Sequence, residues 1–239
     1  SYMSKLMFEQ KMLQPIDHSK LKNLKNIDTK FVQKGLDPEM KYSVPYMMTF
    51  TGIAYNTKKV KNFKSSWTMF ERSDLAGRMT LLNDLREVIG AALKLNGYKY
   101  NSTDDKELEI AMNTVIKWKK NIAKFDVDEA KRGLSSGEFF LIQVYNGDAL
   151  QLISENPDLA FATPAEGTTL SQDDFVIPST AKNAELAYRF IDFMLDPENS
   201  KTNMEFVYYL SPNIPAQKLM SEEFMTDPAI NPPKSVLDR

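Results

Sequence analysis

The 239-residue chain contains no cysteine, which excludes disulfide bonds, thiolate metal sites and cysteine nucleophiles. It has one histidine, His18, so a metal site built from several histidines is excluded and a Ser-His-Asp triad has little support. The nine glycines form neither GxGxxG nor GxxxxGK[ST], so the sequence shows no phosphate-binding loop. No apolar run approaches the length of a membrane span. These absences direct attention to carboxylate and aromatic side chains.

The charge balance gives no sign of a nucleic-acid partner. The formal net charge is −2, and no basic block carries interleaved aromatic residues, so we expect no nucleic-acid surface. Hydrophobic residues make up 42% of the chain and charged residues 26%, as in ordinary globular proteins. The length suffices for one large domain or two lobes with real cores.

Strand-like and helix-like segments alternate along the chain, which favours an α/β architecture with a largely parallel sheet. Strands are predicted from short runs rich in apolar residues, and helices from apolar positions that recur at intervals of three and four. The run at residues 138–145 is almost continuously apolar, as expected for a central strand buried on both faces. The other main elements are strands near residues 78–82 and 159–163, and helices near residues 85–96, 102–120 and 184–195.

Two carboxylates stand at the start of the helix predicted for residues 85–96, which Gly97 is expected to terminate. Asp84 occupies the N-cap position and Glu87 lies three residues later, a spacing close to a capping box. On this stretch alone, capping explains both residues more simply than ligand binding does. The remainder of the chain changes that balance.

Polar clusters follow three of the predicted strands. They are Asp84 with Glu87, the segment from Tyr145 to Asp148, and Asp173 with Asp174. Ligands of open α/β sheets bind beyond the carboxyl ends of the strands, so these clusters are candidate binding residues. Carboxylates pair with ammonium groups, and tyrosine rings cover methylenes or contact cations through their faces. The mixture suits a cationic, partly aliphatic ligand.

Seven short segments occur in an order that is typical of one protein family. They are residues 42–46 (YSVPY), 52–56 (GIAYN), 66–67 (SW), 82–88 (LNDLREV), 146–149 (NGDA), 177–178 (IP) and 181–183 (AKN). Together they resemble the polyamine-binding proteins of bacterial ABC importers, the spermidine/putrescine-binding family. The resemblance covers nearly the whole chain, and its most specific part is the D-x-R-E-V motif that begins at Asp84.

The resemblance implies an α/β, periplasmic-binding-protein-like fold of type II, in which two lobes of mixed sheets flanked by helices close on a ligand. Residues 1–50 and 174–216 would form the first lobe, and residues 57–170 and 217–239 the second. Family members carry a further strand–helix–strand at the start and a longer C-terminal helix. We therefore expect a chain truncated at both ends, with an incomplete first lobe whose shortened sheet has an open edge.

The resemblance also assigns ligand-binding roles. The carboxylates would bind amino groups of the polyamine, and the tyrosines would line its alkyl chain. The residues concerned are Asp84, Glu87, Asp173, Tyr145, Tyr209 and Tyr2. Ser171 departs from the family pattern, which has an aromatic residue there; losing that ring removes ~0.5–2 kcal/mol of packing and cation–π contact.

The function implied by the resemblance is that of a receptor, not an enzyme. It would capture putrescine or spermidine in the periplasm, or tethered by a lipid outside the cytoplasmic membrane, and deliver it to the permease and ATPase of an ABC importer. No cofactor and no metal are implied. Three alternatives stay open. The chain could be a receptor of the same fold for another small solute, or a hydrolase that uses Asp84 with Glu87 or Asp173 with Asp174 as an acid/base pair. In the third alternative, Asp84 and Glu87 only cap the helix, Tyr145 only packs, and the chain binds nothing.

Overall fold

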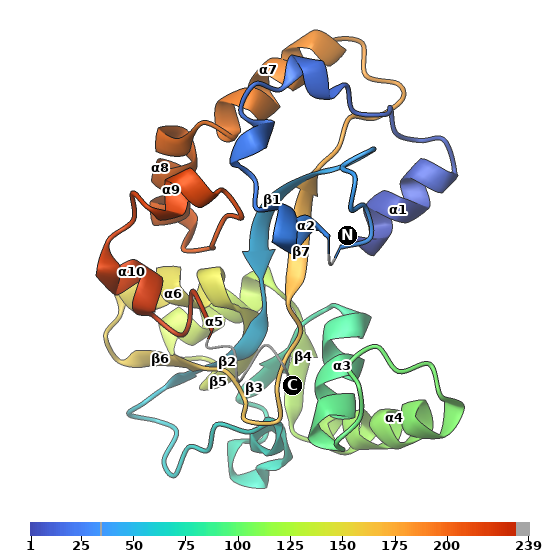
Figure 1. Cartoon of the computed structure of the whole chain (residues 1–239). Coiled ribbons are helices and arrows are strands. Elements are labelled where there is room, and N and C mark those ends of the chain that lie inside the picture. The colour runs from blue at the N-terminus through green and yellow to red at the C-terminus, as the bar shows by residue number, and fades with distance from the viewer. Residues whose placement is uncertain (34, 233–239) are drawn as a thin grey trace. The chain divides into compact units, whose positions relative to one another are not determined.

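The structure is a computed structural model that describes residues 1–33 and 35–232. The chain folds into two compact units, each built from segments that are distant in sequence. Unit 1 comprises Ser1–Thr49 and Ser171–Ile230, and unit 2 comprises Phe50–Leu170 together with Asn231 and Pro232 (Figure 1). Over the described part of the chain, no helix combines the length and apolar character needed to cross a membrane.

The C-terminal part of the chain differs from the lobe boundaries expected from the sequence, which placed residues 217–239 in the second lobe. Residues 217–230 instead belong to unit 1. The reason is local: Gln217 ends the short helix α9 (Ile214–Gln217), and its side-chain amide donates to the Ser211 carbonyl at 2.7 Å. Residues 233–239 lie outside the described residues.

Unit 2 is built on a five-stranded mixed sheet. Its strands are β2 (Thr51–Asn56), β3 (Met79–Leu81), β4 (Ile122–Phe125), β5 (Leu141–Tyr145) and β6 (Leu159–Ala162), in the order β4-β3-β5-β2-β6. Strand β3 runs parallel to β4 and β5, whereas β2 runs antiparallel to β5 and β6. The largely parallel sheet favoured by the alternation of elements is therefore wrong. Strand β2 follows the preceding strand β1 (Val44–Thr49) with no helix between them. Parallel neighbours need a crossover connection, usually a helix, and without one β2 can run antiparallel to the strands beside it.

Helices cover both faces of this sheet (Figure 1). On one face, Ile53 and Leu141 pack in a core with α3 (Leu85–Leu95) and α4 (Asp105–Lys119). On the other face, their sequence neighbours Ala54 and Ile142 pack with residues from α5 (Asp128–Ser136) and α6 (Asn146–Glu155). Strand β5 is the middle strand and is buried along residues 141–144, which confirms the central strand predicted from its apolar run.

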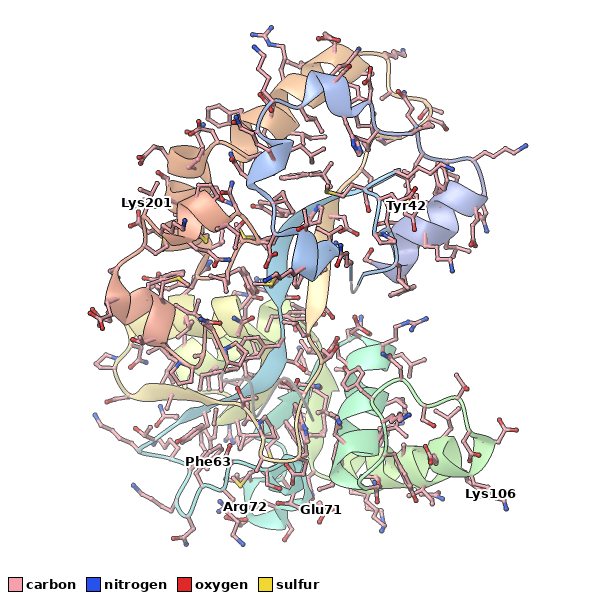
Figure 2. All side chains as sticks on the ribbon, viewed as in Figure 1. Tyr42, Phe63, Glu71, Arg72, Lys106 and Lys201 are labelled. Atoms are coloured by element: carbon pink, nitrogen blue, oxygen red, sulfur yellow. The ribbon has the colours of Figure 1, made fainter. Side chains whose placement is uncertain are left out.

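The loop that follows β2 is anchored by aromatic side chains. The ring of Phe63, labelled in Figure 2, stacks on Tyr55 of β2 with ring centroids 3.7 Å apart. The chain then forms two short 3₁₀ helices, η3 (Trp67–Glu71) and η4 (Ser73–Leu75). Trp67 is fully buried, and its indole N–H donates to the Gly167 carbonyl at 3.0 Å. This hydrogen bond ties the loop to the segment that follows β6.

Unit 1 has a smaller sheet in which β1 pairs antiparallel with β7 (Ser171–Phe175). Leu210 forms a bridge to β1 by accepting a hydrogen bond from the Met48 amide at 2.8 Å. Its core includes Val44 and Ile177 beside Tyr188 and Ile191 of α7. The helices of unit 1 are α1 (Tyr2–Glu9), η1 (His18–Lys20), η2 (Leu24–Asn26), α2 (Thr29–Val32), α7 (Ala184–Met194), α8 (Pro197–Val207), α9 and α10 (Glu222–Thr226).

Gly52 in β2 is a close-packing position, and we expect Gly52→Ala to destabilise the chain by about 2 kcal/mol. A Cβ atom there would lie 2.4 Å from Phe161 Cζ and 2.7 Å from the Ala162 carbonyl oxygen, a backbone atom that cannot rotate away. Urea unfolding measures the effect. Gly77→Ala is the comparison, because a Cβ atom on Gly77 would meet open space. That substitution should lower the stability by only ~1 kcal/mol, the cost of placing alanine at a left-handed φ of +74°. Equal stability of Gly52→Ala and the unsubstituted chain would contradict the packing.

Candidate functional site

Asp84 caps helix α3, as its position in the sequence predicts. Strand β3 ends at Leu81, and three residues later the Asp84 backbone is extended, with φ −131° and ψ 109°. Its Oδ1 atom accepts hydrogen bonds from the amides of Arg86 at 2.9 Å and Glu87 at 3.3 Å. The helix ends at Leu95, and Gly97 follows with φ +80°, so both predicted ends of this helix are confirmed.

Tyr145 lies next to this cap. It is the last residue of β5, which runs parallel to β3, so the chain leaves both strands at the same edge of the sheet. The Tyr145 hydroxyl donates to Asp84 Oδ2 at 3.4 Å. One oxygen of Asp84 therefore holds the helix while the other faces a tyrosine. The convergence of these two strand ends, expected from the sequence, is found in the structure.

The Glu87 side chain is buried, with 6% of the residue exposed. Its Oε2 atom accepts two hydrogen bonds, from Thr51 Oγ1 at 2.9 Å and from the Tyr100 hydroxyl at 2.7 Å. Among the described residues, the Glu87 carboxylate thus bonds to β2 and to the loop after α3, and not to the Asp84 amide that a capping box requires. The capping-box interpretation holds for Asp84 alone.

Thr51 connects this carboxylate to the sheet and to Thr168, in the segment between β6 and β7. It is fully buried and lies opposite Tyr145 in the antiparallel pair of β2 and β5. The Thr168 hydroxyl donates to the Thr51 carbonyl at 2.7 Å, and the two hydroxyl oxygens are 3.2 Å apart. Asp84, Glu87, Tyr145, Tyr100 and Thr51 therefore form one hydrogen-bonded group around the start of α3, which we call the α3 cluster.

The electrostatics of the α3 cluster favour a cation. Burial raises the pKa of the Glu87 carboxyl; the hydrogen bonds from Tyr100 and Thr51 oppose that rise, and the charge of Asp84 adds to it. Burial, and then the charge of Glu87, also raise the pKa of Tyr100, so its phenol stays protonated and donates. Neither carboxylate belongs to an ion pair found among the described residues. The cluster thus holds negative charge that a bound cation would neutralise.

The third predicted carboxylate, Asp173, belongs to unit 1. Asp173 and Asp174 lie within β7 and not beyond its end, so their predicted position after a strand is wrong. Two charged residues fit inside this strand because β7 belongs to a small two-stranded sheet. Asp173 pairs with Met47 and is exposed, whereas the Asp174 side chain is 1% exposed and accepts from Ser4 Oγ at 2.9 Å. Partial desolvation, and then the charge of Asp174, raise the pKa of Asp173 although the residue is exposed.

The remaining predicted residues also lie in unit 1, around β1 and β7. Tyr2 begins α1 and is 48% exposed, and the same helix provides the Ser4 hydroxyl that binds Asp174. Tyr209 precedes Leu210, the residue that bridges Met48 of β1. Ser171 begins β7 opposite Thr49. Unit 1 thus carries Asp173, Tyr2, Tyr209 and Ser171, while Asp84, Glu87 and Tyr145 belong to unit 2.

Tyr100 was not predicted from the sequence, although it donates the shorter of the two hydrogen bonds that the Glu87 carboxylate accepts among the described residues. Tyr100 lies in a loop three residues after the helix terminator Gly97, and no strand end marks it. One signal was present: Gly90 interrupts the interior of a strong helix at the position three residues after Glu87, on the same face. A glycine there indicates that another group approaches the helix closely.

Solved structures of other bacterial proteins have a similar fold. A spermidine/putrescine ABC transporter substrate-binding protein from Streptococcus pneumoniae superposes with a TM-score of 0.86 and 34% identity, over 99% of this chain and 73% of that one. The Tp0655 lipoprotein of Treponema pallidum superposes with a TM-score of 0.83 and 31% identity, over 92% of this chain and 71% of that one. The periplasmic-binding-protein-like fold expected from the resemblance is confirmed.

The sequence comparisons agree with the structural ones. The spermidine/putrescine-binding periplasmic protein of Escherichia coli is 36% identical over 222 residues, which are 92% of this chain and 64% of that protein. The chain therefore spans a little under two thirds of the length of this curated relative. Residues 2–232 match the model of a family described as bacterial extracellular solute-binding proteins. With its fold, its relatives and this match in agreement, the chain belongs to the bacterial extracellular solute-binding protein family.

Proposed function

We propose that this chain is a polyamine receptor that binds putrescine or spermidine through the α3 cluster. The observation that supports this most is the pair Asp84 and Glu87, two carboxylates at one helix start that form no ion pair among the described residues. Polyamine nitrogens are protonated near neutral pH and would supply the missing positive charge. The ring of Tyr145, beside Asp84, would cover methylenes or contact the cation through its face.

The relatives support the same ligand class and suggest the setting. The Escherichia coli relative is named as a periplasmic protein that binds spermidine and putrescine, and the Streptococcus pneumoniae structure as a substrate-binding protein of an ABC transporter. We therefore propose that the chain acts outside the cytoplasmic membrane, in a periplasm or tethered by a lipid. Its partners would be the permease and ATPase of an ABC importer.

Asp173 is proposed as a further ligand carboxylate, with Tyr2 and Tyr209 as aromatic contacts in the same unit. Its side chain is exposed, so it is accessible to an amino group. We expect Asp173→Asn to weaken spermidine binding about tenfold, because a charge-assisted hydrogen bond is lost. Calorimetric titration measures this. The control is Asp105→Asn, an exposed aspartate in the first turn of α4, which should bind as the unsubstituted chain does. Equal affinity of the two variants would remove Asp173 from the proposal.

Two other functions are distinguished by direct assays. A receptor of the same fold for another solute is favoured by Ser171, which stands where the family pattern has an aromatic residue. A thermal-shift screen with polyamines, amino acids and sugars separates these cases, since a ligand raises the melting temperature of the chain that binds it.

The chain belongs to a family of solute-binding proteins, and we propose that it is not an enzyme. Turnover of a glycoside panel would contradict that.

A further inference from the structure

Tyr100 approaches helix α3 from outside the helix. Gly97, with φ +80°, reverses the chain after α3, and three residues later the Tyr100 ring lies across the helix at Gly90. A Cβ atom built on Gly90 would lie 2.2 Å from the ring carbon that bears the Tyr100 hydroxyl, and 2.4 and 2.5 Å from the two ring carbons beside it. The ring therefore occupies the space that any other residue at position 90 would need.

The position of the ring determines where its hydroxyl points. Gly90 lies three residues after Glu87, so both residues are on one face of the helix, one turn apart. With its ring against Gly90, Tyr100 donates to Glu87 Oε2 at 2.7 Å, and Thr51 donates to the same oxygen at 2.9 Å from the sheet side. Among the described residues, both hydrogen bonds that this carboxylate accepts go to Oε2, so Oε1 can accept a donor from a ligand. The two hydrogen bonds also fix the rotation of the carboxylate.

We propose that Tyr100 is a positioning residue for the ligand carboxylate Glu87, and that Gly90 is required because it gives the Tyr100 ring its place against α3. The proposal rests on the proposed function, in which Glu87 binds an amino group of a polyamine. Tyr100 acts on the ligand through Glu87: it orients the carboxylate and holds it in the charged form that an ammonium group needs.

The surroundings of Glu87 explain why such a donor matters. Among the described residues, the titratable groups that act on this carboxylate or on its partners are Asp84 on the same helix, Tyr100 in the following loop and Tyr145 at the end of β5. Asp84 and burial both favour the protonated form of Glu87, whereas Thr51 and Tyr100 favour the ionised form. Tyr100 itself stays a protonated phenol because burial and the charge of Glu87 raise its pKa. Removing the Tyr100 hydroxyl therefore shifts the balance towards protonated, weakly binding Glu87.

Tyr100→Phe is the direct test, because it keeps the ring against Gly90 and removes only the hydroxyl. We expect spermidine affinity at pH 7 to fall about tenfold, as for a lost hydrogen bond to a charged group. The control is Tyr98→Phe, a hydroxyl deletion in the same loop whose ring packs on the core of unit 2. Gly90→Ala, which displaces the ring, should lower the affinity at least as much as Tyr100→Phe does.

Two measurements separate positioning from a merely structural role. Carboxyl NMR titration of the ligand-free chain should show a higher pKa for Glu87 in Tyr100→Phe than in Tyr98→Phe, and this measurement needs no polyamine. In a Glu87→Gln background, Tyr100→Phe should no longer change spermidine affinity. An unchanged Glu87 pKa, or an equal loss of affinity in that background, overturns the proposal. If no polyamine binds the unsubstituted chain, the proposed function fails, and the NMR titration still decides whether Tyr100 controls Glu87.

Discussion

Asp84→Asn should lower the affinity of the chain for spermidine about 100-fold, or ~3 kcal/mol, while leaving its stability almost unchanged. The substitution removes the negative charge but keeps the shape of the side chain and the oxygen that caps α3. Asparagine and aspartate cap helices almost equally well, so the hydrogen bonds to the amides of Arg86 and Glu87 are retained. Calorimetric titration and urea unfolding measure the two effects separately.

The chain offers a matched control for this variant. Asp104 caps α4 in the same way, accepting from the amides of Lys106 at 2.9 Å and Glu107 at 3.1 Å. Lys106, labelled in Figure 2, marks this start of α4. Asp104→Asn should alter neither affinity nor stability, because Asp104 is exposed and lies outside the α3 cluster. If Asp84→Asn binds spermidine as tightly as Asp104→Asn does, Asp84 is a cap and not a ligand residue.

Glu87→Gln should have opposite effects on stability and on binding. Glutamine keeps a carbonyl oxygen that can accept from Thr51 and Tyr100, but it removes a buried charge whose desolvation disfavours the folded state. We expect the ligand-free chain to gain about 1 kcal/mol, or ~2–4 °C in melting temperature, and to lose about tenfold or more in spermidine affinity. Such a trade-off is typical of binding sites whose ligand-contacting groups destabilise the ligand-free chain.

The pH dependence provides a second signature of Glu87. The pKa of Glu87 in the folded chain lies above the ordinary glutamate value. At a pH between these two pKa values, the folded state therefore holds a proton that the unfolded state has released. The contribution of Glu87 to the stability of the ligand-free chain therefore rises as the pH falls through the raised pKa, contrary to the usual behaviour of a carboxylate. Spermidine affinity should fall over the same interval, because the ammonium group pairs with the ionised form.

Glu107→Gln is the control for both effects. Glu107 occupies the position in α4 that Glu87 occupies in α3, three residues after the capping aspartate, but it is not buried. We expect no gain in stability and no change in the pH dependence of binding from Glu107→Gln. A Glu87→Gln variant that is less stable than Glu107→Gln in the absence of ligand would contradict the expected gain in stability. It would show that the folded state compensates the desolvation of the Glu87 charge.

The parts of the site that the sequence predicts are those set by local chemistry. The cap at Asp84 and the end of α3 at Gly97 depend on residues within one or two turns, so the sequence contains all the information needed. The approach of Tyr145 to Asp84 follows from one general rule, that parallel strands β3 and β5 end at the same edge. These positions alone indicate only a cationic, partly aliphatic ligand, and the family resemblance narrows the ligand to a polyamine.

The parts that the sequence does not predict depend on tertiary contacts. The direction of β2 depends on how the chain enters the sheet, and its composition fits a parallel or an antiparallel strand equally well. Asp173 and Asp174 lie inside β7 even though charged residues disfavour strands, because pairing with β1 and contacts from α1 outweigh local preference. Tyr100 meets Glu87 only because the chain folds back over Gly90, a contact between residues thirteen apart.

If the chain binds its ligand through the charge of amino groups, it should distinguish two ligands that differ only in that charge. Putrescine and 1,4-butanediol have the same four-carbon chain, but the diol carries hydroxyl groups in place of the two ammonium groups. We expect a saturable heat of binding when putrescine is titrated into the unsubstituted chain in a calorimeter, and none with 1,4-butanediol under the same conditions. Comparable binding of the diol, or no binding of putrescine and spermidine, would show that amino-group charge does not determine binding.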